Sequence, residues 1–287
     1  MAIIVTPLEE LVGCTLGARV EGVALSALVD AEWALIERAF HQYALLIFPG
    51  QHLAPTAQED FARRFGEIEI LVEGRRSIAI SNRGEQGQPI REDSVFMQLL
   101  RGNEGWHTDS SYMPLAAKAS VLSAQVLPPH GGETEWADMR AAYDALAPAL
   151  RARVDGLAAH HSLFYSQARI GAQAQVGDYY GFNAGDAPLR PLVKVHPVTG
   201  RRALFIGRHA CNIPGMESQA SEALLDGLMD FACQPPRVYT HRWQAGDVAV
   251  WDNRCLLHRA RPYDYTQARV MTHTRVRGEP ATEMALA

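Results

Sequence analysis

The sequence has few cysteines, little net charge and no long hydrophobic run, and each shortage excludes a class of protein. The four cysteines are widely separated and show no C-x-x-C spacing. That pattern indicates reduced thiols rather than a disulfide framework or a zinc knuckle, and it favours the cytoplasm. The formal net charge of −5 gives no reason to expect nucleic acid or an anionic membrane as a partner. No apolar run approaches the roughly 20 residues that a membrane-spanning helix needs.

What remains is typical of a globular protein long enough for one large core. Hydrophobic residues make up 47% of the 287 residues and charged residues 21%, which is the balance of a soluble globular chain. No repeat, low-complexity tract or linker divides the sequence, so we expect a single domain over residues 1–287. This composition is compatible with a homo-oligomer.

Short strand segments between turns rich in Gly and Pro run through the sequence. Hydrophobic spacing predicts strands over residues 44–48, 77–81, 118–126 and 268–278, and a hairpin of residues 238–243 and 248–253. Helical spacing predicts helices over residues 30–42, 56–66, 139–154 and 218–233. Because the helices do not alternate with the strands, we expect a mainly β fold with flanking helices. An antiparallel sandwich or jelly roll fits this order better than a doubly wound parallel sheet.

Particular side chains are expected to set the helix ends. Thr56 and Glu59 have the spacing of a capping box at the start of the second helix. Asp138 stands where an N-cap would begin the third helix, and Pro148 should kink or divide that helix.

The stretch GNEGWHTDSSY, residues 102–112, places His107 and Asp109 two positions apart. This composition produces roughly one H-x-[DE] by chance, and one is found, so the tripeptide alone carries little information. On a strand, however, residues i and i+2 face the same side, so both side chains would reach one metal ion. A second histidine would complete a 2-His-1-carboxylate triad, which leaves positions open and suits Fe(II). Zinc catalysis usually takes three protein ligands and one water instead.

Position favours His258 as the second histidine. It follows the apolar run in VAVWDNRCLLHRA and precedes another strand. His209 and His241 stay open as alternatives. His196, in HPVTGR, is expected in a turn at the surface.

Separated motifs carry a resemblance to a known family. In chain order they are FPGQHL, FARRFGEIE, WHTDSSY, PPHGGETEWADMRAAYDAL, HPVTGR, GDVAVWDNRCLLHRA and ARVMTHTRV. Together they resemble the taurine dioxygenase family of Fe(II)- and 2-oxoglutarate-dependent oxygenases. ALLIFPGQHL, HSLFYSQ, PLRPLVKVHPVTGR and GRHACNIPGM narrow the resemblance to its phenoxyalkanoate dioxygenases, particularly those acting on (S)-phenoxypropionates. The resemblance implies a double-stranded β-helix, or jelly-roll, fold that works with Fe(II), 2-oxoglutarate and oxygen.

The resemblance also implies roles for individual residues. His107, Asp109 and His258 would be the iron ligands. Arg269 matches the family arginine that pairs with the distal carboxylate of 2-oxoglutarate, a role that suits its planar fork of donors. Thr134 matches a hydroxyl that meets the same cosubstrate.

Further positions concern the cosubstrate and the substrate acid. Asn103 matches an asparagine near the cosubstrate pocket. His273 stands where the taurine enzyme has a second arginine, which binds the substrate sulfonate. A histidine is a weaker, pH-dependent partner for an anion. We therefore expect Arg208, in IGRHA, to supply the cation for an acidic substrate, with His273 at the substrate as well.

The reaction implied by the resemblance converts 2-oxoglutarate and oxygen to succinate and carbon dioxide while a substrate carbon is hydroxylated. In a phenoxypropionate this carbon carries the ether oxygen, so the product collapses to a phenol and pyruvate. Three alternatives stay open. They are the same chemistry on a sulfonate or other small organic acid, a zinc-dependent hydrolase with the same ligands, and a non-catalytic jelly-roll sensor of a small acid.

Overall fold

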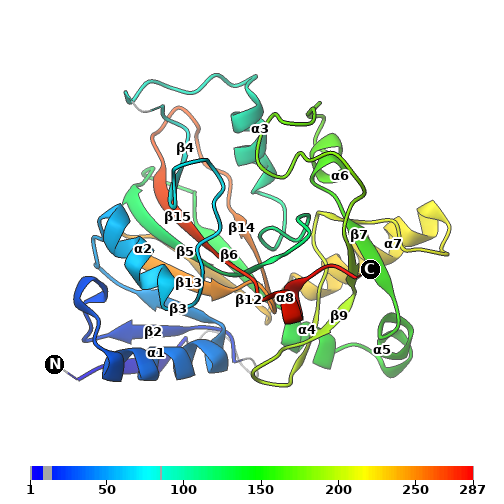
Figure 1. Ribbon diagram of the computed structural model, residues 1–287, viewed down its shortest axis with the longest axis horizontal. Coiled ribbons are helices and arrows are strands. Elements are labelled where there is room, and N and C mark those ends of the chain that lie inside the picture. The colour runs from blue at the N-terminus through cyan, green and yellow to red at the C-terminus, as the bar shows by residue number, and fades with distance from the viewer. Residues whose placement is uncertain (1, 9–14, 85, 287) are drawn as a thin grey trace.

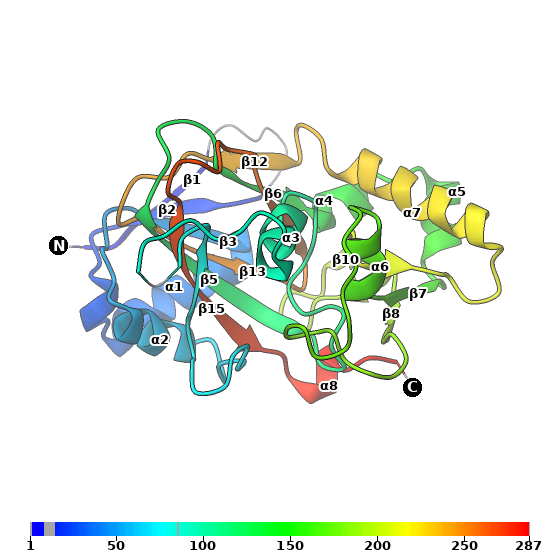
Figure 2. The same ribbon diagram turned by 90° about the horizontal axis from the view of Figure 1, so that it is seen from above.

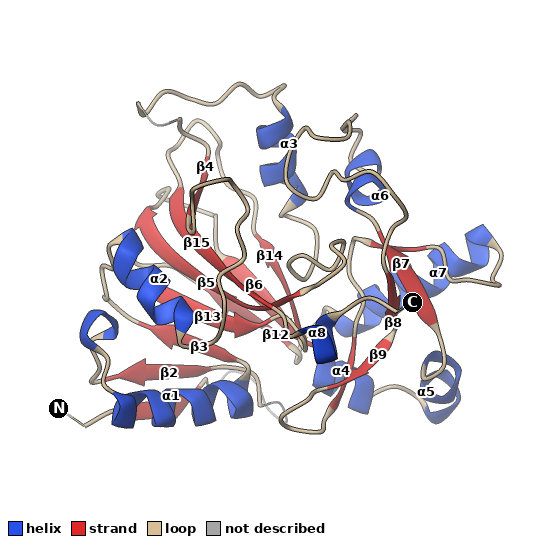
Figure 3. Ribbon diagram, viewed as in Figure 1, coloured by secondary structure: helices blue, strands red, loops and turns tan. Residues whose placement is uncertain are grey.

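The computed structural model describes residues 2–8, 15–84 and 86–286, and its strands form a central body that helices flank (Figures 1 and 3). A seven-stranded sheet has the order β1-β2-β3-β13-β5-β15-β4. Its strands are β1 (Ile4–Pro7), β2 (Ala18–Glu21), β3 (Leu45–Phe48), β4 (Ile78–Ser81), β5 (Ala117–Val126), β13 (Val248–Asp252) and β15 (Val270–Arg277). Neighbouring strands are antiparallel except β2 and β3, which run parallel. The coarse prediction of a mainly β fold with flanking helices is confirmed.

Smaller sheets complete the strand framework. The order β12-β6-β14 describes an antiparallel sheet of three strands. These strands are β12 (Val238–His241), β6 (Thr134–Asp138) and β14 (Leu256–Ala260). A three-stranded sheet has the order β11-β7-β8, and β10 pairs with β9. The bounds of these strands are β7 (Ala158–His161), β8 (Leu189–Pro191), β9 (Val193–Val195), β10 (Arg202–Leu204) and β11 (Ala210–Cys211). The strands β7 and β9 lie near the C-terminus in Figure 1.

The helices fall into groups around these sheets. The helix α1 (Asp30–Tyr43) contacts β3, and α2 (Pro55–Arg63) contacts β5 and β15, so both cover the large sheet (Figures 1 and 2). The helices α3 (Val95–Gly102) and α6 (Leu163–Ala168) pack against each other. The remaining helical segments are η1 (Leu25–Ala27), α4 (Met139–Asp144), α5 (Pro148–Val154), α7 (Ser218–Ala232) and α8 (Pro280–Glu283). Among the described residues, no helix combines the length and apolar character needed to span a membrane.

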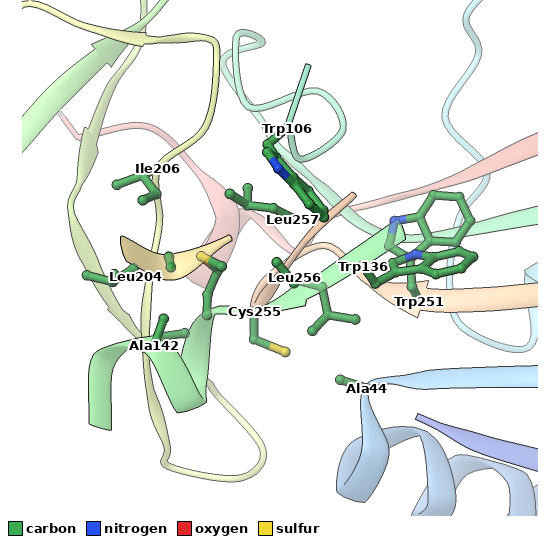
Figure 4. Close-up of a cluster of buried hydrophobic side chains, with 14 of the residues drawn as sticks. Ala44, Trp106, Trp136, Ala142, Leu204, Ile206, Trp251, Cys255, Leu256 and Leu257 are labelled. Carbon is green, nitrogen blue, oxygen red and sulfur yellow. The ribbon is translucent and has the colours of Figure 1, made fainter. Parts of the chain in front are cut away.

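The central strand β13 is buried on both faces. Val248 and Val250 pack in the hydrophobic cluster beneath α1 and α2, whereas Ala249 and Trp251 belong to the other cluster. This division follows from the strand period of two residues. Figure 4 shows Trp251 beside Trp136 of β6, and their rings meet edge to face at 5.7 Å. The large sheet therefore buries one face under helices and turns its other face toward the β12-β6-β14 sheet.

The structure confirms the predicted start of the third helix and corrects the predicted start of the second helix. Asp138 accepts hydrogen bonds from the backbone N–H groups of Arg140 and Ala141, at 2.9 and 3.3 Å, so it caps α4 as predicted. Pro148 begins the separate helix α5, also as predicted. The capping box at Thr56 was wrong. Pro55 occupies the first turn of α2, whose N-cap residue makes no side-chain capping bond.

The predicted hairpin of residues 238–243 and 248–253 was wrong. β12 pairs with β6, whereas β13 pairs with β3 and β5, so the two segments belong to different sheets. The apolar run of β13 needs partners on both edges and cover on both faces, which a two-stranded hairpin does not supply. The short turn between the segments specifies a reversal of the chain and not which strand it pairs with.

The expectation that His196 lies at the surface was also wrong, because its side chain is buried. Its Nε2–H donates to Asp252 at 3.0 Å, and its Nδ1 accepts the backbone N–H groups of Val198 and Thr199. Asp252 also accepts two hydrogen bonds from Arg254, at 2.8 and 2.6 Å. The HPVTGR turn is thus fastened to the end of β13 by buried hydrogen bonds.

Acid stability should depend on His161, which is buried with no hydrogen-bond partner for either ring nitrogen among the described residues. Burial and the nearby charges of Arg190 and Lys194 lower the pKa of His161 to about 3. Between about pH 6.5 and pH 3, His161 is therefore protonated in the unfolded chain but not in the folded chain. The free energy of unfolding consequently falls as the pH is lowered through this range.

Replacing His161 with Leu removes this penalty. We expect the free energy of unfolding of His161→Leu, relative to wild type, to rise by about 2 kcal/mol between pH 8 and pH 5. Urea unfolding at the two pH values measures the change, with the exposed His130→Leu as the matched control. If His161→Leu were more stable than wild type by the same amount at both pH values, the pH dependence could not be assigned to His161.

Candidate functional site

Two adjoining cavities open beside the inner face of the large sheet. They share the residues Ile80, Asn103, His107, Asp109 and Arg275. The first, here the Arg208 cavity, is further lined by Leu71, Ile78, Phe96, Leu99, Leu100, Tyr112, Leu163, Gln167, Tyr179, Tyr180, Arg208 and His209. The second, here the Arg269 cavity, is further lined by Leu122, Thr134, Trp251, His258, Ala260, Arg269 and His273. Inward-facing residues of both sheets thus form the Arg269 cavity, while α3 and α6 wall the Arg208 cavity.

Three side chains converge where the cavities meet. His107, Asp109 and His258 are buried, and one potential ligand atom from each lies within 4.8 Å of the others. The two histidines form a backbone pair, with N–H to oxygen distances of 3.0 and 2.8 Å, which sets their ring centroids 4.2 Å apart. The chain then turns at Ser110, where φ is 53°, so Asp109 approaches the pair from a turn rather than from a continuous strand.

The protonation of these side chains suits a metal ligand set. Burial lowers the pKa of His107 to about 4, and burial with the neighbouring His107 holds the pKa of His258 well below its usual range. Burial alone would raise the pKa of Asp109, but the Arg275 guanidinium and the neighbouring histidines hold it well below its usual range. At neutral pH the site therefore offers two neutral imidazoles and one carboxylate, the donor set of non-haem Fe(II).

Hydrogen bonds orient this donor set. The Nδ1 of His107 lies 2.8 Å from the carbonyl oxygen of Gly105, which leaves Nε2 for a metal. Ser120 on β5 donates to Oδ2 of Asp109 at 2.6 Å, and Asn253 donates to Ser120 at 2.9 Å. The side-chain oxygen of Asn253 in turn accepts the backbone N–H of Asp109 at 3.3 Å. The sequence contained no signal for Ser120 or Asn253, because their role depends on strands that meet only in the fold.

Arg275 is the main charged residue that the sequence interpretation missed. Its Nη2 lies 2.8 Å from Oδ1 of Asp109, and its Nη1 donates to the hydroxyls of Ser110 and Tyr112 at 3.1 and 3.4 Å. The signal was present, because in the predicted strand over residues 268–278 the period of two that puts Arg269 and His273 on one face puts Arg275 there as well. The cation at this position serves the carboxylate of Asp109.

The residues predicted for the cosubstrate gather in the Arg269 cavity. Arg269 is buried, donates through Nε to the carbonyl of Gly132 at 3.2 Å and lies over the ring of Tyr263. Within the described part of the chain it forms no ion pair, and burial lowers its pKa. The hydroxyl of Thr134 accepts a hydrogen bond from the indole of Trp243 at 3.0 Å. Asn103 lines both cavities.

The two residues predicted for the substrate line different cavities. Arg208 lines the Arg208 cavity, and its Nη2 donates to the carbonyl of Ser166 at 2.6 Å. It has no carboxylate partner among the residues described, and burial lowers its pKa to about 10. His273 instead lines the Arg269 cavity, with Nε2 3.6 Å from Asp109 Oδ2 and its ring stacked on Trp251. A substrate-binding role for His273 stays a prediction.

A second cluster with metal-ligand chemistry, formed by His41, His196 and Asp252, lies outside the two cavities. The donor atoms of His196 and Asp252 are occupied by hydrogen bonds, whereas Nδ1 of His41 has no hydrogen-bond partner among the described residues. Asp252 accepts from Arg254 and His196, and the remaining ring nitrogen of His196 accepts two backbone N–H groups. The adjacent Arg254 guanidinium would also oppose a cation, so this cluster is structural.

The chain is similar over nearly its whole length to known proteins. The model of the family "Taurine catabolism dioxygenase TauD, TfdA family" matches residues 5–275. The chain is 54% identical over 279 residues to the (S)-phenoxypropionate/alpha-ketoglutarate-dioxygenase of Sphingobium herbicidovorans, covering 95% of this chain and 96% of that protein. It is 39% identical over 284 residues to the alpha-ketoglutarate-dependent 2,4-dichlorophenoxyacetate dioxygenase of Cupriavidus pinatubonensis, covering 94% and 96%. The crystal structure of AAD-2 in complex with Mn(II) and N-oxalylglycine superposes with a TM-score of 0.90, at 37% identity, over 100% of both chains.

Metal affinity tests the hydrogen bonds around Asp109. Replacing Ser120 with Ala removes the hydroxyl that holds Oδ2, and we expect the affinity for Mn(II), a redox-stable probe, to fall by about 10- to 100-fold. Isothermal titration calorimetry measures it. The matched control is Ser123→Ala, which removes a buried hydroxyl bonded to Gln58 from the other face of β5. Equal Mn(II) affinity for Ser120→Ala and wild type would rule out the orienting role.

Proposed function

Because the chain belongs to the taurine catabolism dioxygenase TauD, TfdA family, we propose that it is an Fe(II)- and 2-oxoglutarate-dependent dioxygenase of aryloxyalkanoic acids. It hydroxylates the carbon next to the ether oxygen, and the product collapses to a phenol and a 2-oxoacid. The cosubstrate leaves as succinate and carbon dioxide. Relatives that act on (S)-phenoxypropionate and 2,4-dichlorophenoxyacetate support this substrate class.

The observation that carries the proposal is the charge pattern of the two cavities. Three arginines line them, and the guanidinium of Arg275 is paired with Asp109. Arg208 and Arg269 have no carboxylate partner in the described residues, and one lies in each cavity. A half-buried or buried cation without a counter-ion favours an anionic ligand. The site therefore fits two different acids, one on each side of a common metal position.

Each group of residues has a defined task in this reaction. His107, Asp109 and His258 would hold Fe(II), which supplies the redox chemistry with oxygen. Arg269 and Thr134 bind the distal carboxylate of 2-oxoglutarate. Arg208 binds the carboxylate of the aryloxy acid. Positioning then directs the substrate C–H bond toward the metal.

The remaining lining of the Arg208 cavity suits an aryl ring. Its apolar members include Phe96 and Leu99 of α3, Leu163 of α6 and Tyr179, and the rings of Phe96 and Tyr179 meet at 6.2 Å. Such side chains bind an aromatic group and exclude water from the reacting centre. A zinc hydrolase or a non-catalytic sensor would need neither a second buried cation beside the triad nor this pair of cavities.

The finer structural assignments form part of the proposal. We assign the two facing sheets to the jelly-roll class and residues 1–287 to a single catalytic domain. The family match over residues 5–275 and the full-length superposition on AAD-2 support both assignments. The scattered cysteines support a place in the cytoplasm.

Succinate formation tests the proposed reaction. The anaerobically purified protein, given Fe(II), 2-oxoglutarate and oxygen, should form succinate faster with (R)- or (S)-2-phenoxypropionate or phenoxyacetate than with taurine. Removing a ligand by His107→Ala should abolish the substrate-dependent rate. A panel in which no aryloxy acid stimulates succinate would contradict the substrate class, and an active His107→Ala would contradict the metal assignment.

Substitutions of the two unpaired arginines should raise different Michaelis constants. We expect Arg208→Gln to raise KM for the aryloxy acid by about tenfold or more, since it removes a charge-assisted bond to a carboxylate, with little change in KM for 2-oxoglutarate. Arg269→Gln should raise KM for 2-oxoglutarate instead. Each variant is the control for the other, and equal rises in both constants for both variants would refute the division of the site.

A further inference from the structure

The amide of Gln167 lacks a partner although it is buried. The residue lies near the end of α6 and is 2% exposed, and neither Oε1 nor Nε2 has a hydrogen-bond partner among the described residues. Leaving such a group unsatisfied costs about 1–3 kcal/mol. Gln167 lines the Arg208 cavity, so a ligand bound there is the partner that its position allows.

The amide and the Arg208 guanidinium approach the same point. A Cβ atom built on Gly102, the last residue of α3, would lie 2.5 Å from Nη1 of Arg208 and 2.7 Å from Nε2 of Gln167. A Cβ on Gly105 would lie 3.0 Å from Cδ of Arg208. The missing side chains of these glycines therefore make room for both donors.

The free donors of this pair match a carboxylate. Arg208 uses Nη2 for the carbonyl of Ser166, and its Nη1, the atom near Gln167, has no acceptor among the described residues. Two nitrogen donors, one of them charged, lie beside the same glycine, and no described carboxylate pairs with Arg208. A carboxylate has two oxygens and accepts from both. A half-turn of the amide exchanges its nitrogen and oxygen, so the N–H group reaches the anion from either orientation.

We propose that Gln167 is a substrate-binding residue that, with Arg208, forms the carboxylate subsite of the Arg208 cavity. One carboxylate oxygen accepts from the amide of Gln167, and the other accepts from Nη1 of Arg208. This assignment rests on the proposed function, because it names the group of the substrate acid that enters the cavity. Arg208 supplies the charge, and Gln167 fixes the orientation of the carboxylate, hence the position of the neighbouring carbon.

Two substitutions at Gln167 separate hydrogen bonding from packing. Gln167→Leu keeps the size and removes the donor, and because it also removes an unsatisfied buried amide, it should fold at least as stably as wild type. Gln167→Glu places an anion beside Arg208, where it competes with the substrate. The control is Gln219→Leu, the same change at an exposed position of α7.

Kinetics with an aryloxy acid give the first readout. Gln167→Leu should raise KM for the acid about tenfold, the effect of losing a hydrogen bond to a charged group, and Gln167→Glu should raise it further. KM for 2-oxoglutarate should stay at the wild-type value in both variants and in Gln219→Leu. An unchanged KM for the acid in Gln167→Leu would overturn the proposal, as would equal rises for acid and cosubstrate.

Gly102→Ala tests the same subsite by adding a methyl group beside Arg208 and Gln167. The added methyl displaces Nη1 of Arg208 and Nε2 of Gln167 together, so KM for the acid should rise without loss of Mn(II) affinity. A wild-type KM in Gly102→Ala would show that the two donors do not act on one group and would overturn the proposal.

Equilibrium binding keeps the test independent of turnover. Calorimetry of phenoxyacetate with the Mn(II)- and 2-oxoglutarate-loaded protein should show weaker binding for Gln167→Leu than for wild type and Gln219→Leu. If no aryloxy acid stimulated succinate formation, the proposed function would be contradicted but the role of Gln167 would not. The binding measurement would still test whether Gln167 contributes to carboxylate binding. Equal affinities, or no carboxylate binding by wild type, would overturn the subsite.

Discussion

The buried carboxylate of Asp109 is the group on which the rest of the site depends. It lies between the cation of Arg275 on β15 and the hydroxyl of Ser120 on β5, with two imidazole rings beside it. A buried anion is costly unless it is paired and hydrogen-bonded, so these partners are needed before any metal binds. Arg275 and Ser120 bind different oxygens of this carboxylate from the neighbouring strands β15 and β5. These contacts attach the turn that carries Asp109 to the large sheet.

Pairing Arg275 with Asp109 determines what the other cations are free to do. Arg208 and Arg269 stay without protein carboxylates in the described chain, one in each cavity. The fold keeps them apart because Arg269 immediately precedes β15 of the large sheet, whereas Arg208 follows β10 and lies beside α3 and α6. Anions on the two sides of the histidine pair would then meet a common metal from different directions, which is the requirement of a reaction that couples two acids.

The sequence predicted the local elements and the clustering of His107, Asp109 and His258 better than it predicted how distant strands combine. His107, Asp109 and His258 could be selected because their motifs lie in the order of a known family. The pairing of β12 with β6 could not, since a short turn carries no information about the partner strand. Arg275 was overlooked although its alternation with Arg269 was visible, because charged residues facing inward contradict the usual sandwich pattern. Ser120 and Gln167 become meaningful only through contacts across the fold.

A crystal structure of the Mn(II) complex with 2-oxoglutarate and an aryloxyalkanoic acid would show where each acid binds. We expect the metal on His107, Asp109 and His258, the distal carboxylate of 2-oxoglutarate on Arg269, and the carboxylate of the second acid on Arg208. A complex with both acids in one cavity, or with Arg275 released from Asp109 to bind the second acid, would contradict this arrangement.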